Sequence, residues 1–180
     1  MNLLRSRDEV PYVRSFEDDP AAGDRLVILP AEDTASTSRG RPIGYEYFDV
    51  NEKLAFMDAH GIDISVISLA NPWLDWVTPN DAAEIARQVN DDTEKLCLEH
   101  EGRLFAFATL PLSAPADDIV REIERVSRLA HMRGIVMGSS GLGSGLDDPS
   151  LDPIYAALQE NDQLVVRILS LPVWNILQCS

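Results

Sequence analysis

Residues 56–75 read Phe-Met-Asp-Ala-His-Gly-Ile-Asp-Ile-Ser-Val-Ile-Ser-Leu-Ala-Asn-Pro-Trp-Leu-Asp and join a helix end, a strand and a loop. Gly61 is placed to adopt the left-handed conformation that closes a helix. The strand Ile62 to Leu69 is apolar on both faces, which is typical of the middle of a parallel sheet covered by helices. The loop Asn71-Pro72-Trp73 follows the carboxyl end of this strand, where such sheets bind ligands. We therefore expect this loop to belong to a functional site.

The composition indicates one acidic domain. The chain has 180 residues, 45% of them hydrophobic, which is enough for one core. Its formal net charge of −15 repels phosphate backbones and anionic membranes, so neither nucleic acid nor a membrane is an expected partner. No apolar run approaches the roughly 20 residues of a membrane span, and no signal sequence follows Met1. We therefore expect a cytoplasmic protein, with Cys97 and Cys179 as free thiols.

From Asp49 onward, helical and strand periods alternate as they do in repeated βα units. A cap at Thr78, with Pro79 and Asp81 in the first turn, opens the most clearly marked helix. The predicted helices lie at 50–60, 78–102 and 115–130, with a short one from 152, and the predicted strands at 62–69, 104–110, 134–138 and 164–168. The first 48 residues differ: Val10–Phe16 and Arg25–Leu29 predict a hairpin, and residues 31–44 a mobile loop.

Four parallel strands with helices between them fit either a small doubly wound sheet or part of a (β/α)8 barrel. A complete barrel takes about 250 residues, so this chain can hold only part of one. In both folds the ligand binds at the carboxyl ends of the strands. Here those ends are Asn71–Trp73, Pro111–Ser113 and Ser139–Gly145.

Familiar catalytic motifs are missing from the sequence. The three histidines, His60, His100 and His131, show neither His-x-His nor His-Glu-x-x-His spacing, and we expect each to complement the dipole at a helix end. There is no Gly-x-Ser-x-Gly motif. The glycine-rich loop 138–149 lacks the P-loop and dinucleotide patterns, and Asp147 and Asp148 add negative charge, so we favour a loop at the mouth of a site over a phosphate cradle.

Two polar residues are candidates for binding a substrate. Asn71 stands at a strand end, where its amide can both donate to and accept from a polar ring edge, or can instead hold the Asn-Pro turn. Arg41 lies in the predicted loop, where it can clamp an anion or simply aid solubility. Trp73 and Trp76 are spaced to flank a pocket, although core packing explains them equally well.

The ordered motifs 56–73, 102–115, 133–138 and 146–149 resemble the amidohydrolase-related decarboxylases, among them the aminocarboxymuconate semialdehyde, resorcylate and dihydroxybenzoate decarboxylases. Within this family, Ile-Ser-Leu-Ala-Asn-Pro-Trp and Ser-Ser-Gly-Leu-Gly-x-Gly-Leu-Asp-Asp-Pro most resemble the fungal uracil-5-carboxylate (isoorotate) branch. The resemblance covers Val10 to Val166. It implies three segments: an N-terminal insertion (1–48), a partial barrel of about four βα units (49–168) and a divergent tail (169–180).

The resemblance implies non-oxidative decarboxylation of an aromatic or pyrimidine acid, assisted by a divalent metal, usually zinc. It places Arg41 and Asn71 as substrate-binding residues. The family's His-x-His strand, its later metal-binding histidine and its acid aspartate have no counterpart here, so we expect a truncated chain with no metal or catalytic residues of its own. Two rivals stay open: an inactive fragment that acts by association, such as a homo-oligomer, and a small nucleotide-binding α/β domain.

Overall fold

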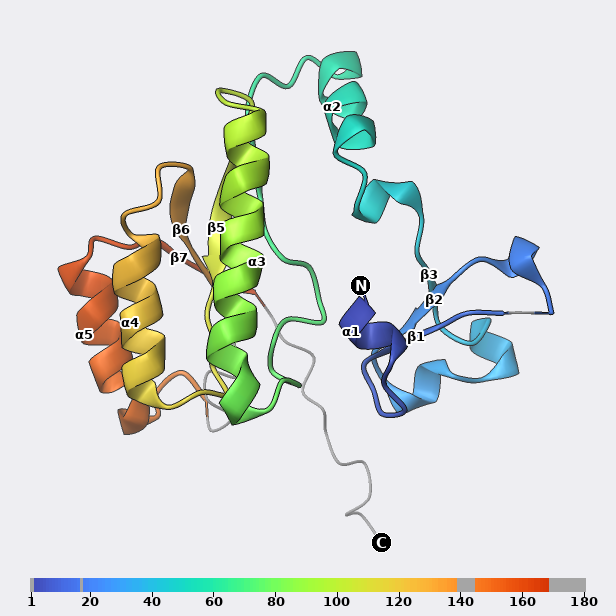
Figure 1. The fold of residues 1–180 in the computed structure, drawn as a ribbon, viewed down its shortest axis with the longest axis horizontal. Helices are drawn as coiled ribbons and strands as arrows, with labels where there is room; N and C mark the ends of the chain where they lie inside the picture. Colours follow the sequence, from blue (N-terminus) through green and yellow to red (C-terminus); the bar gives the residue numbers. More distant parts are fainter. Residues whose placement is uncertain (1, 17, 139–144, 169–180) are drawn as a thin grey trace, which may run out of the picture. The chain divides into compact units, whose positions relative to one another are not determined.

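The chain folds into two units, one ending at Ile62 and the other beginning at Asp63. The computed structural model describes residues 2–16, 18–138 and 145–168 (Figure 1). No helix in these three ranges combines the length and the hydropathy of a membrane span.

The N-terminal unit is built on a small antiparallel sheet with strand order β1-β2-β3. The predicted hairpin is confirmed, because Tyr12 pairs with Val27 and Arg14 with Arg25. The elements of this unit are α1 (Asn2–Arg5), β1 (Tyr12–Arg14), η1 (Pro20–Ala22), β2 (Arg25–Val27), η2 (Pro30–Glu32), η3 (Ala35–Thr37), β3 (Arg41–Pro42), η4 (Tyr45–Tyr47) and α2 (Val50–Ala59).

The segment 31–44, predicted as a mobile loop, contains η3, β3 and most of η2, and its mobility stays a prediction. Two local interactions order it. The Glu32 carboxylate accepts hydrogen bonds from the backbone N–H groups of Ile28 (2.9 Å) and Leu29 (3.1 Å). Gly40, with φ +118°, lies so close to β2 that an added Cβ would be 2.9 Å from the Leu26 carbonyl oxygen. These interactions could not be predicted from the sequence, because the stretch is polar and rich in turn-forming residues.

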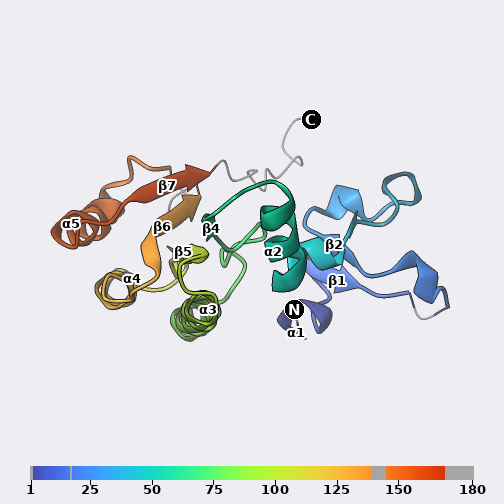
Figure 2. The same ribbon diagram turned by 90° about the horizontal axis from the view of Figure 1, so that it is seen from above.

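The C-terminal unit is a parallel sheet with strand order β4-β5-β6-β7, which is also the order along the chain. Its elements are β4 (Ser65–Ile67), α3 (Pro79–Glu99), β5 (Leu104–Thr109), α4 (Ala116–Val126), β6 (Met132–Gly138), η5 (Pro149–Leu151), α5 (Asp152–Glu160) and β7 (Val165–Ile168). Figure 2 shows α3, α4 and α5 following one face of the curved sheet. An unreversed strand order with helices on one face is that of a barrel and not of a doubly wound sheet. The predicted partial barrel is therefore confirmed.

The predicted position of the first barrel strand is wrong. β4 is the edge strand of the sheet and spans three residues. Val66 in this strand is 43% exposed, and Ile64 directly before it is 55% exposed. The sequence alone suggested a central strand, because residues 62–69 are apolar on both faces. Within the described residues no strand pairs with the free edge of β4, so part of its apolar surface stays open.

The helix boundaries follow the sequence signals closely. α3 begins after the cap position Thr78, whose hydroxyl donates to the Asp81 carboxylate (2.7 Å). Gly61 (φ +65°) and Gly102 (φ +80°) both take the left-handed conformation after their helices. The core lies between the sheet and the helices, where Ile119, Ile123 and Val126 of α4, Ile135 of β6 and Ile154 of α5 are buried. The burial of these apolar side chains holds the helices against the outer face of the sheet.

Candidate ligand site at the strand ends

The loops that follow β4 and β5 leave the same edge of the sheet, because the two strands are parallel and hydrogen-bonded neighbours. They carry Asn71–Trp76 and Leu110–Ala114. The third predicted strand end, Ser139–Gly145, lies outside the described residues except for Gly145. The candidate site is therefore defined by two loops.

Asn71 is half-buried, and its side-chain amide makes no hydrogen bond to any described residue. The alternative that this amide ties down the Asn-Pro turn has no support in the structure. An amide at a strand end that is not used by the fold keeps two donors and an acceptor for a ligand.

Two further polar atoms at this edge are buried and unsatisfied. The indole N–H of Trp73 and the hydroxyl oxygen of Ser113 have no hydrogen-bond partner among the residues that the structure covers. Leaving such a group unpaired costs about 1–3 kcal/mol, so it is uncommon outside functional positions. The site thus gains a donor from each of the two loops.

Ser113 was not singled out by the sequence analysis, although its place directly after a strand could have marked it. Asp75 was also missed. The surrounding protein withdraws water from its carboxyl group and raises the pKa of Asp75 above the ordinary aspartate value. The residue remains exposed, so the carboxyl stands at the surface with protein atoms on one side, and solvent limits the shift.

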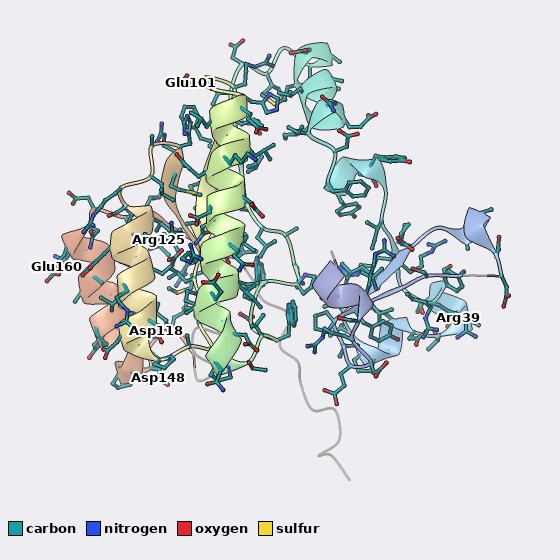
Figure 3. The ribbon with its side chains drawn as sticks, viewed as in Figure 1. Arg39, Glu101, Asp118, Arg125, Asp148 and Glu160 are labelled. Carbon is teal, nitrogen blue, oxygen red and sulfur yellow. The ribbon has the colours of Figure 1, made fainter. Side chains whose placement is uncertain are left out.

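A buried polar network holds the end of β5 behind the site. The Asn90 amide of α3 donates to the Thr109 carbonyl oxygen (2.9 Å) and to Glu122 of α4 (2.7 Å), and it accepts from the Thr109 N–H (2.9 Å). Arg125, labelled in Figure 3, pairs with Glu122 through two 2.8 Å hydrogen bonds. It also contacts Asp91 of α3. The Glu122 carboxylate raises the pKa of Arg125, which stays charged. The loop bearing Ser113 therefore starts from a fixed strand end.

Arg41 belongs to the N-terminal unit and Asn71 to the C-terminal unit. Arg41 lies in β3 rather than in a loop, and its Nε donates to Glu32 Oε1 at 2.9 Å. Burial alone would raise the pKa of Glu32, but hydrogen bonds from Ile28, Arg41 and Leu29 outweigh it, and the pKa is lowered. The carboxylate is therefore ionised at neutral pH and orients Arg41. The predicted substrate-binding roles of Arg41 and Asn71 stay predictions.

The histidines do not form a metal site. Throughout residues 2–16, 18–138 and 145–168, no three His, Cys, Asp or Glu side chains are grouped to hold a metal ion. His60 and His100 are the C-cap residues of α2 and α3, as expected. His131 is not at a helix end, because α4 stops at Val126; its Nδ1 lies 2.9 Å from Glu94 Oε1. Buried Cys97 is a free thiol, as predicted.

Comparison with known proteins shows the family to which the chain is related. Residues 46–176 match the amidohydrolase family. The chain is 32% identical over 130 residues to the gamma-resorcylate decarboxylase of Rhizobium radiobacter, a match that covers 68% of this chain and 39% of that protein.

Solved structures agree with the sequence match. The apo structure of IDCase, the isoorotate decarboxylase of Metarhizium anisopliae, is similar with a TM-score of 0.84 and 44% identity, over 92% of this chain and 46% of that chain. The 5-carboxyvanillate decarboxylase of Novosphingobium aromaticivorans, with bound manganese and 3-methoxy-4-hydroxy-5-nitrobenzoic acid, gives a TM-score of 0.58 and 31% identity, over 63% and 33% of the two chains. The chain spans less than half the length of each of these relatives. It belongs to the amidohydrolase family.

Proposed function

We propose that this chain carries part of the substrate site of a metal-dependent, non-oxidative decarboxylase for pyrimidine or aromatic carboxylic acids, such as uracil-5-carboxylate. In this reaction the bond between the ring carbon and the carboxylate breaks, carbon dioxide leaves, and the ring carbon takes up a proton. The 44% identity to the isoorotate decarboxylase supports the pyrimidine acid as the first substrate to test. The observation that carries the proposal is the unused amide of Asn71 at the strand end.

Asn71 suits a pyrimidine edge because one amide offers a donor and an acceptor side by side, as a ring N–H and a neighbouring carbonyl require. Trp73 and Ser113 supply the buried N–H and hydroxyl at the same sheet edge. A ligand that hydrogen-bonds these atoms removes their desolvation penalty. The three groups therefore favour a flat, polar heterocycle or a hydroxylated ring over an apolar one.

Arg41 is proposed to neutralise the anionic charge of the substrate. Its Nε and Nη2 atoms both donate to Glu32 Oε1, which leaves Nη1 without a hydrogen bond to the described residues. Glu32 thus acts as a positioning group that fixes the guanidinium while one edge stays open. A bound arginine with a free donor edge can pair with a carboxylate without first breaking its own ion pair.

A divalent ion supplies the family's chemistry by holding the substrate carboxylate, and zinc is the ion we expect, whereas the Novosphingobium relative holds manganese. The described residues do not fit such an ion, since no ligand set exists among them. In this proposal the described residues of the chain therefore serve substrate recognition.

The test is calorimetric titration of the purified chain with 5-carboxyuracil, together with metal analysis and an assay of carbon dioxide release. We expect saturable binding that Asn71→Ala weakens about tenfold, the loss of roughly one hydrogen-bonded contact. The matched control is Asn80→Ala, an exposed asparagine at the start of α3, which should bind as the native chain does.

The outcomes separate the rival readings. Binding with stoichiometric metal and turnover supports an active decarboxylase, and binding without turnover supports a fragment that recognises substrate but lacks the reacting centre. No binding of 5-carboxyuracil or of 2,6-dihydroxybenzoate would overturn the proposal. Thermal stabilisation by uridine monophosphate in place of either acid would support the nucleotide-binding domain.

A further inference from the structure

The N-terminal unit contains a pocket of about 300 Å³ that the proposed function does not use. One part of its wall is apolar, formed by Phe16, Ala22 and Ala35, and the other part is polar, formed by Asp19, Arg25, Ser38 and Arg39. All seven residues belong to the same unit. The pocket is therefore a feature of this unit alone.

Arg25 is the unusual member of the pocket wall. Its Nε atom is buried without a hydrogen-bond partner, and its guanidinium forms no ion pair with any residue that the structure describes. Arg14 also has a buried Nε without a hydrogen-bond partner, but its guanidinium pairs with Asp33, as that of Arg5 pairs with Asp24. A half-buried guanidinium without a counter-charge is costly, and it is rarer still in a chain of net charge −15.

A turn with a strained backbone places a second guanidinium group, that of Arg39, in the wall of the same pocket. Ser38 (φ +55°) and Arg39 (φ +57°) are successive non-glycine residues in the left-handed region. Arg39, labelled in Figure 3, is half exposed, and its Nη1 lies 3.8 Å from Asp33 Oδ1, too far for a hydrogen bond. Its donors are thus available to a ligand, and the Ser38 hydroxyl adds another.

We propose that this pocket binds a small organic carboxylate, with its carboxylate on Arg25 and Arg39 and its apolar body against Phe16, Ala22 and Ala35. The planar guanidinium fork matches a carboxylate. Asp19 in the wall repels a doubly charged phosphate more strongly than a monoanion, so it favours the carboxylate. The carboxylate of the ligand supplies the ion-pair partner that Arg25 does not have among the described residues.

The experiment is a ¹⁵N-resolved NMR titration of the full chain with benzoate. We expect saturable shifts at the backbone amides of Ser38, Arg39 and Gly40, and no such shifts with benzyl alcohol, which lacks the carboxylate. Arg25→Met should weaken benzoate binding about tenfold or more. Arg87→Met, which removes an exposed arginine of α3, is the matched control and should leave the titration unchanged.

Further variants keep the inference separate from the proposed decarboxylase. Asn71→Ala should leave the shifts at Ser38 to Gly40 intact, because Asn71 lies in the other unit. If Arg25→Met does not fold, Arg39→Gln tests the same pocket at an exposed position and should weaken binding about threefold. Three outcomes would each overturn the proposal. The first is benzoate shifts confined to residues 71–76 and 110–114, and the second is equal benzoate affinity of both arginine variants and the native chain. The third is tighter binding of inorganic phosphate than of benzoate.

Discussion

At Gly134 the barrel sheet requires a residue without a side chain. It lies in β6 with φ +144°, and an added Cβ would stand 2.4 Å from the Leu164 carbonyl oxygen. We expect Gly134→Ala to lower the free energy of unfolding by roughly 2–4 kcal/mol, from backbone strain plus a clash with a backbone atom that cannot move aside. Urea denaturation followed by circular dichroism measures this loss.

The matched control is Gly102→Ala in the same unit. Gly102 is also left-handed, with φ +80°, but nothing lies within 4 Å of its added Cβ. Only the left-handed penalty of about 1–2 kcal/mol applies there. Equal losses for the two alanine variants would show that the close approach to Leu164 is not the cause.

Glu32 makes the stability of the N-terminal unit depend on pH. Its pKa is lowered in the folded state, because hydrogen bonds from Ile28, Arg41 and Leu29 outweigh the opposing effect of burial. The stabilisation is therefore complete above the unfolded value of about 4.3 and is lost as the pH falls through the lower folded value. We expect Glu32→Gln to cost roughly 1–2 kcal/mol at neutral pH and less in acid.

Urea unfolding of the native chain and of Glu32→Gln, at neutral pH and near pH 3, measures this difference. Glu52→Gln serves as the control, since Glu52 is an exposed residue of α2 in the same unit and should change stability by less than about 0.5 kcal/mol. A Glu32→Gln deficit that stays constant across the two pH values would contradict the assigned role.

At the scale of elements, Asn90 joins α3, β5 and α4. Asn90→Ala removes the acceptor of the buried Thr109 N–H. It also removes one donor to the Thr109 carbonyl oxygen and one to the Glu122 carboxylate, which keeps its pair with Arg125. We expect a loss of roughly 2–4 kcal/mol in the free energy of unfolding, together with faster hydrogen exchange at the Thr109 amide. Asn80→Ala, on the same helix but exposed, should stay within about 0.5 kcal/mol of the native chain. Unchanged exchange at Thr109 would refute the network's role.

The helix and strand order was predictable because it depends on local signals. The cap at Thr78, the glycines at 61 and 102 and the apolar periods of residues 50–168 all act over a few residues. The order within residues 31–44 was not predictable, because it depends on Glu32 reaching the backbone of Ile28 and on Gly40 approaching β2. Such contacts leave no periodic pattern in the sequence.

At the scale of the whole molecule, we expect association to depend on the edge of β4, which pairs with no strand among the described residues. Exposed, unpaired edge strands promote pairing with other chains, and Val66 is a 43% exposed apolar residue on this strand. We expect the native chain to self-associate with rising concentration and Val66→Lys to shift it toward monomer, as measured by sedimentation velocity. Leu98→Lys removes an equally apolar, 59% exposed side chain from α3 and should not. Identical sedimentation of the two lysine variants would exclude β4 as the contact.

Sequence by itself determined the βα order, the partial barrel, the strand-end loops and the family. These follow from short-range periodicity, caps and ordered motifs. Only the tertiary structure decided which polar groups lack a partner among the described residues; these include the Asn71 amide, the Trp73 N–H, the Ser113 hydroxyl and the Arg25 Nε. The reason is physical: a side chain's hydrogen bonds and ion pairs depend on neighbours far away in the sequence, so its freedom to bind a ligand appears only once the chain is folded.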